Sequence, residues 1–176
     1  MKILAKPFVF FIVSVVLVSC YTSERVISKS NSPEKYQSFP LTDVTAITTP
    51  YEGKVYTAEE VSEMTRFPAC EDQSIAVEEL KSCADREMLR YIYSNIKYPA
   101  IARENGVQGT VVIEFVVTPL GRIRSARIAR DPGAQTGNSA MDIIANMDRS
   151  YTWKPAMLDG KAVAVLYKLP VKYKLL

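Results

Sequence analysis

The chain has 176 residues, 48% of them apolar, and it contains no histidine. This length leaves room for one modest domain and a linker, and it excludes a second large core. The net charge of +3 hides an uneven distribution: residues 20–85 carry 6 Lys and Arg against 12 Asp and Glu, whereas residues 86–176 carry 14 against 7. The sequence therefore predicts an acidic arm joined to a basic domain.

The amino terminus has the pattern of an export signal. Lys2 and Lys6 precede an apolar run over residues 8–18, which is shorter than the ~20 residues of a membrane-spanning helix. The following Leu17-Val18-Ser19-Cys20 resembles the lipobox of bacterial lipoproteins. That resemblance implies a signal peptide over residues 1–19 and acylation of Cys20. An uncleaved single-span anchor is the alternative.

Export also bears on partners and location. An exported domain has no nucleic acid to bind, so we expect no nucleic-acid partner for its arginines. A lipid on Cys20 predicts a protein held at a bilayer, on the periplasmic side of the cell envelope. No Asp follows Cys20 directly, which in some bacteria favours the inner leaflet of the outer membrane over the inner membrane.

Two further cysteines, Cys70 and Cys83, remain if Cys20 carries lipid. In an oxidising compartment we expect them to form a disulfide. It would close a loop of about 13 residues and stabilise the fold by ~3 kcal/mol in the chain-entropy model. Two free or buried thiols are the alternative. With no His and no second Cys pair, we expect no metal site and no cofactor.

The chain before residue 85 is expected to hold little structure. Residues 20–60 are rich in Ser, Thr, Pro, Lys and Glu with isolated apolar positions, which predicts a disordered tether in the periplasm. Residues 61–84 form a lead-in segment with the disulfide loop. Residues 85–176 then form the folded domain.

Helical signals begin at Asp85, a candidate N-cap for an amphipathic helix with apolar residues at helical spacing. Tyr98-Pro99 ends this helix, because the residue before proline is disfavoured in the α region, and a short turn from Pro99 runs to Gly106. A second helix is expected after Asn138 or Ser139.

A hairpin follows the first helix. The β-branched run over residues 110–118 has valine on both faces, which predicts a central strand. Pro119 and Gly121 fit its turn. The returning strand carries four arginines, which we expect to face water at a sheet edge, and a break in its alternation predicts a bulge near Ser125 and Ala126.

The last strand, over residues 162–175, alternates between an apolar and a lysine-bearing face. Pro170 cannot donate a ladder hydrogen bond, which predicts a sheet edge or a half-paired strand. Such an edge either accepts an extended peptide or is blocked by Pro170 and the lysines. The only tryptophan, Trp153, is expected to cover the core edge. The fold class predicted is α+β: a small three-stranded antiparallel sheet, made of the hairpin and the C-terminal strand, with two helices packed on one face, preceded by a flexible tether.

The order of these elements and their motifs is similar to the carboxy-terminal domain of the TonB family. The residues that carry the resemblance include Tyr98-Pro99, Gly106-Val107-Gln108-Gly109, Phe115-Val116-Val117-Thr118, Trp153-Lys154-Pro155 and Leu169-Pro170-Val171, with a lead-in at Val55-Tyr56 and Phe67-Pro68.

The resemblance implies a protein-interaction module and not an enzyme. Its partner would be an outer-membrane TonB-dependent transporter or another envelope protein, bound by strand addition to residues 162–169 near Tyr98 and Pro99. The candidate partner-binding residues are Tyr98, Pro99, Val163, Ala164, Val165, Leu166 and Tyr167. An energy transducer with an uncleaved inner-membrane anchor and a proton-driven motor is the alternative, and a homodimer stays open.

Overall fold

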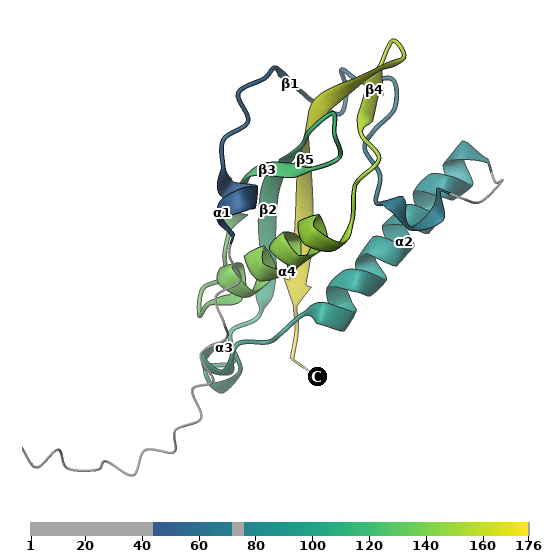
Figure 1. Ribbon diagram of the computed structural model, residues 1–176. Helices are drawn as coiled ribbons and strands as arrows, with labels where there is room; N and C mark the ends of the chain where they lie inside the picture. The colour runs from purple at the N-terminus through teal and green to yellow at the C-terminus, as the bar shows by residue number, and fades with distance from the viewer. Residues whose placement is uncertain (1–43, 72–75, 176) are drawn as a thin grey trace, which may run out of the picture. The chain divides into compact units, whose positions relative to one another are not determined.

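The sheet is built on a central strand, β2 (Gly109–Val117). In the computed structural model, which describes residues 44–71 and 76–175, β2 pairs antiparallel with β3 (Ile123–Arg130) on one side and with β5 (Lys161–Tyr173) on the other (Figure 1). One face of β2 is fully buried; its residues are Val111, Ile113, Phe115 and Val117. The prediction of a central first strand is confirmed.

The β2–β3 hairpin has both predicted local features. Gly121 lies in the turn with a φ of +72°, a conformation that costs a residue with a Cβ atom free energy. The register shifts between Glu114 and Val116, so that Ser125 and Ala126 together lie opposite one residue of β2. The predicted β-bulge is therefore present.

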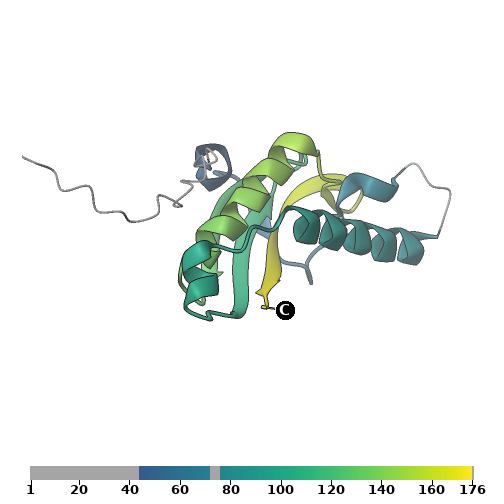
Figure 2. The ribbon, with the colours of Figure 1, turned by 90° about the horizontal axis from the view of Figure 1, so that it is seen from below.

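Three helices lie in the predicted regions: α2 (Val77–Asn95), the short α3 (Ala100–Glu104) and α4 (Thr136–Ser150). Helix α4 begins at Thr136, after Gln135, so the caps predicted at Asn138 or Ser139 are wrong. Helix α4 packs across β2 and β3, with α2 on the β5 side of it (Figures 1 and 2). Their apolar stripes enter one core, whose helical members include Ala84, Met88, Ile92, Ala140, Ile143, Ile144 and Met147. One face of the sheet is thus covered by helices.

Helix α2 begins earlier than Asp85, the predicted cap. It starts at Val77, with Glu78 and Glu79 in its first turn, where carboxylates interact favourably with the helix dipole. Cys83 is a buried residue of this helix. The boundary predicted between residues 84 and 85 therefore falls inside a continuous helix and is wrong.

The prediction of a three-stranded antiparallel sheet is also incomplete. Two short strands join it: β1 (Val55–Tyr56) pairs parallel with β5, and β4 (Ala156–Leu158) pairs antiparallel with β5. The strand order is β1-β5-β2-β3, so the sheet is mixed. Strands of two or three residues are too short to show alternation, which is why the sequence pattern did not reveal them.

The part of the predicted tether that the structure describes packs on the domain. Helix α1 (Thr45–Thr48) contacts β3, and Ile47 is 1% exposed within the main core. The Ser125 backbone N–H donates to the Thr49 carbonyl at 2.9 Å. Residues 49–54 then lead from the β3 edge to β1 on the opposite edge of the sheet. The folded unit therefore includes residues 44–60, where the sequence predicted disorder.

Trp153 lies inside the core and not at its edge. It is 2% exposed, and its ring meets Phe67, Phe115 and Tyr167 at centroid distances of 5.9, 5.7 and 5.4 Å. Its backbone N–H donates to the Gly121 carbonyl at 2.9 Å. The lead-in segment, the hairpin turn and the last strand therefore meet at one aromatic residue.

Candidate functional site

The last strand, β5, has a different neighbour along each part of its length. Residues 165–173 pair with β2 on one side. On the side away from β2, Ala164 and Val165 pair with β1. At the start of β5, residues 161–163 pair with β4. From Leu166 to Tyr173, no residue of 44–71 or 76–175 pairs with β5 on the side away from β2.

We name this stretch, Leu166–Tyr173 on the side away from β2, the open edge. A strand edge presents unpaired backbone donors and acceptors that an extended peptide can use. Pro170 lies within it and has no N–H to offer. The prediction of a half-paired last strand is confirmed, because β5 is an inner strand at its start and an edge strand afterwards.

The structure separates the seven predicted partner-binding residues into groups. Val163 pairs with β4, while Ala164 and Val165 are buried and already pair with β1. Leu166 and Tyr167 are half-buried at the beginning of the open edge. The partner-binding role of these residues stays a prediction, and only the last two have an unpaired strand side next to them.

Tyr98 and Pro99 lie at the other end of β5. The Tyr98 hydroxyl donates to the Val107 carbonyl at 2.6 Å, and its ring packs edge-on against Tyr173 at 5.5 Å. Pro99 is buried and immediately precedes α3. Tyr173 lies six positions after Tyr167, which corresponds to roughly 20 Å of strand. A peptide along the open edge would therefore run from one predicted group to the other.

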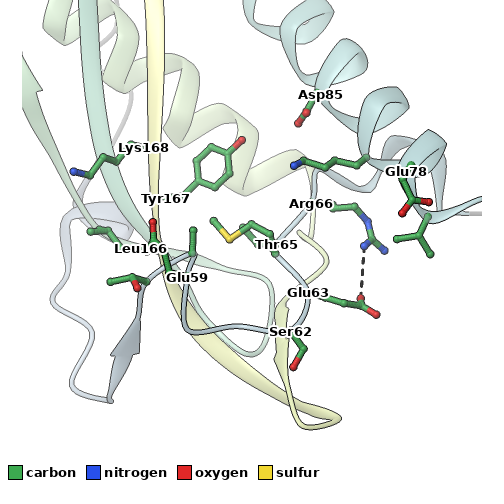
Figure 3. A pocket seen from close by; sticks show the side chains of 15 residues that line it. Glu59, Ser62, Glu63, Thr65, Arg66, Glu78, Asp85, Leu166, Tyr167 and Lys168 are labelled. Carbon is green, nitrogen blue, oxygen red and sulfur yellow. Dashed lines mark ion pairs between the residues drawn. The ribbon is translucent and has the colours of Figure 1, made fainter.

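A pocket of about 850 Å³ lies beside the start of the open edge (Figure 3). Residues 57–66 form one wall and the α2 face with Glu78 and Asp85 forms another, while residues 166–168 of β5 form the third. Figure 3 shows the Tyr167 ring pointing toward α2. Burial raises the pKa of Tyr167 to about 12, and the Asp85 carboxylate adds to the shift. The pocket can receive a side chain of a strand on this edge.

The wall of residues 57–66 is held in place at several points. The Thr57 backbone N–H donates to the Glu60 carboxylate at 2.7 Å. Arg66 pairs with Glu71 at 3.1 Å and with Glu63 at 3.6 Å, and the hydrogen bond to Glu71 is the main reason that the pKa of Arg66 is raised. These contacts give residues 57–66 a defined conformation in the folded domain.

The disulfide predicted between Cys70 and Cys83 is present, with 6.2 Å between the Cα atoms. It joins the 3-10 helix η1 (Pro68–Cys70) to α2, which forms the opposite wall of the pocket. Cys20 lies outside the described residues. Among the described residues, no helix is long and apolar enough to cross a membrane.

Comparison with known proteins identifies the family of the folded domain. The family model of the Gram-negative bacterial TonB protein C-terminal matches residues 94–175. This part of the chain is a TonB C-terminal domain. The family resemblance predicted from the sequence is thereby confirmed. The match supports a TonB-related protein-interaction module of the cell envelope.

A relative and two solved structures are similar to this TonB C-terminal domain. Protein TonB of Vibrio cholerae serotype O1 is 30% identical over 80 residues, which are 45% of this chain and 31% of that protein. The match thus spans under a third of the relative's length. The solution structure of a Helicobacter pylori TonB C-terminal domain is 18% identical, with a TM-score of 0.42, and covers 70% of this chain and 98% of that one. That of Pseudomonas aeruginosa is 23% identical, with a TM-score of 0.34, and covers 45% and 77%.

Sequence reasoning missed two parts of the site around the TonB C-terminal domain. It noted Val55-Tyr56 only as a lead-in motif, although a valine followed by an aromatic residue is favoured in strands. It also missed the wall of residues 57–66, because this wall is joined to the sheet region only by isolated bridges, Glu63 with Met157 of β4 and Arg66 with Lys154 just before β4. Single bridges leave no periodic signal.

Proposed function

We propose that this chain is a membrane-tethered periplasmic TonB-like module that binds an outer-membrane transporter, or another envelope protein, by strand addition to β5. The observation that carries this proposal is the open edge itself. It is a strand side of eight residues, Leu166–Tyr173, without a described neighbour. It begins at the pocket beside Tyr167 and ends next to Tyr98. No catalytic role is proposed.

Strand β1 supports the proposal because it is a short segment already added to the same side of β5. Val55 and Tyr56 pair with Ala164 and Val165 in parallel. Val55 is 37% exposed, and only two residues pair, so little free energy holds this contact. A partner strand that reaches beyond Leu166 toward Ala164 has to displace β1.

The proposed tether is a lipid on Cys20, which would hold the domain at the periplasmic face of a membrane, with the outer membrane favoured. The resemblance of residues 17–20 to a lipobox supports it, and two or more acyl chains suffice for stable anchoring. The mass of the intact protein extracted from membranes tests this. A chain that begins at acylated Cys20 is expected, and a chain that begins at Met1 without lipid would favour the anchored transducer instead.

Photocrosslinking in cells tests the docking edge. A photoreactive residue at Leu166, at the start of the open edge, is expected to crosslink to an outer-membrane transporter. Leu120 is the matched control, because it is 80% exposed at the tip of the β2–β3 hairpin. No envelope adduct from the open edge, or equal adducts from Leu120, would contradict the proposal.

A further inference from the structure

The sheet face opposite the helices carries cations on both neighbours of β2. Glu114 lies across from Arg127 of β3 and Lys168 of β5. Because residues directly opposite each other in a sheet share a face, these three side chains point to the same side. Residues 111, 113 and 115 of β2 face the helices, so Glu114 and its neighbours face away from them.

The next rows extend this pattern toward the end of the sheet that lies away from β1. Val112 lies between Arg130 and Pro170, and Thr110 lies opposite Lys172. We name the four cations the basic face: Arg127, Arg130, Lys168 and Lys172. All four are exposed. Between the two cationic margins lie the uncharged Thr110 and Val112, and then Glu114 in the next row.

Two carboxylates lie near these cations: Glu114 within the face, and Glu59 beside Lys168 at the pocket. Glu114 is 8% exposed and pairs with both Arg127 and Lys168, the latter at 3.2 Å. Its charge is therefore shared by two partners. No described carboxylate forms an ion pair with Arg130 or Lys172. The face keeps an excess of positive charge, and this excess is greatest at the end away from the hairpin turn.

We propose that the basic face lies on an anionic phospholipid bilayer. A sheet face with cations along two margins matches an extended anionic surface, such as the headgroups of a bilayer, better than a single small anion. Long Lys and Arg side chains also reach headgroups while their aliphatic stems cover apolar surface. Each cation near an anionic membrane contributes roughly a fivefold gain in affinity. The inference rests on the membrane tether of the proposed function, which would keep the face close to lipid.

This orientation leaves the docking site free. The backbone donors and acceptors of a strand edge lie in the plane of the sheet. With the basic face against the bilayer, the open edge of β5 would point along the membrane surface. A transporter in the same membrane would then meet the edge from the side.

Flotation with vesicles tests the proposal. The mature chain, residues 20–176, with Cys20→Ser contains every residue that the structure describes and lacks the lipid. It is expected to bind vesicles of 30% phosphatidylglycerol in phosphatidylcholine, and to lose binding in high salt. The double variant Arg130→Gln/Lys172→Gln should bind about 30-fold more weakly, which corresponds to about 2 kcal/mol.

The matched control is Arg86→Gln/Lys161→Gln, which removes the same charge at exposed positions on α2 and at the start of β5. It should change binding less than threefold. Equal losses in both variants, or equal binding to neutral vesicles, would overturn the proposal. So would a dimer that only the Arg130/Lys172 variant abolishes, since it would assign the face to a second copy. Crosslinking from Leu166 in the Arg130→Gln/Lys172→Gln variant tests the docking edge separately. If the variant still crosslinks to a transporter, the docking edge stands even where the bilayer proposal fails.

Discussion

Val55 of β1 lies opposite Ala164 of β5, in a parallel register at the side of the sheet where a partner strand would add. Two residues of the chain's own lead-in segment thus cover the beginning of the edge that we propose for docking. Since α1 and residues 57–66 are held on either side of β1, this contact can open locally while the rest of the domain stays folded.

The pairing of Val55 with Ala164 predicts a specific crosslink. In the double variant Val55→Cys/Ala164→Cys the two Cα atoms lie at the spacing of neighbouring strands, within the range of a disulfide. Oxidation is expected to form it, as mass spectrometry of peptides would show. Val55→Cys/Leu169→Cys is the control, because Leu169 lies five residues further along β5. Equal crosslinking in both would contradict the register.

Gly121→Ala is expected to destabilise the fold strongly. A Cβ atom there would lie 2.1 Å from the Trp153 carbonyl oxygen, and the φ of Gly121 is +72°. The backbone conformation alone costs about 1 to 2 kcal/mol, and relief of the clash would shift the core. We expect a loss of about 3 kcal/mol or more in urea unfolding.

Gly160→Ala provides the matched control for that change. Its φ is +75°, close to that of Gly121, but no atom lies within 4 Å of the added Cβ. Only the conformational cost remains, about 1 to 2 kcal/mol. Equal losses at the two glycines would show that the contact with Trp153 contributes nothing.

The disulfide between Cys70 and Cys83 should contribute measurably to stability. It closes a loop with a sequence separation of 13, for which the chain-entropy model gives about 3 kcal/mol. Cys70→Ser/Cys83→Ser should therefore lower the urea midpoint, and reduction of the native chain should lower it by a similar amount. Cys20→Ser should leave the midpoint unchanged. An unchanged midpoint after reduction would refute the prediction.

Stability should fall in strongly alkaline solution because of two tyrosines. Burial is the main cause that raises the pKa of Tyr167 and of Tyr173 to about 12, against 10 for an exposed phenol. Between pH 10 and 12 the unfolded chain loses these protons before the folded chain does, so the free energy of unfolding decreases as pH rises. By pH 12 each tyrosine is expected to account for about 2 to 3 kcal/mol, and about half of this loss is expected by pH 11.

Urea unfolding at pH 8 and pH 11 measures this effect. Tyr167→Phe and Tyr173→Phe should each reduce the difference between the two pH values, since phenylalanine does not ionise. Below pH 10 both tyrosines are protonated in the folded and the unfolded chain, so the native chain should have its full free energy of unfolding there. A pH dependence that is the same in the native chain and in both variants would contradict the assignment.

The sequence by itself determined the elements whose signals are local. Alternation of apolar residues predicted β2 and β5, Pro119 and Gly121 predicted the turn, and the parity break predicted the bulge at Ser125. The count of cysteines and the export signal predicted the disulfide. These predictions succeeded because side-chain periodicity and turn conformation depend on neighbours within a few residues.

Only the tertiary structure decided which parts of β5 stay open. The partners of β5 are β1, about 110 residues earlier in the chain, and β4, across a tight turn. A two-residue strand has too few positions to show a period, and its pairing depends on contacts that local sequence does not encode. For the same reason the sequence assigned residues 44–60 to a tether, although Ile47 enters the core. The sequence therefore predicted the half-paired state of β5, and the structure shows that its open part begins at Leu166, where β1 ends. Docking of a partner on this edge stays a prediction.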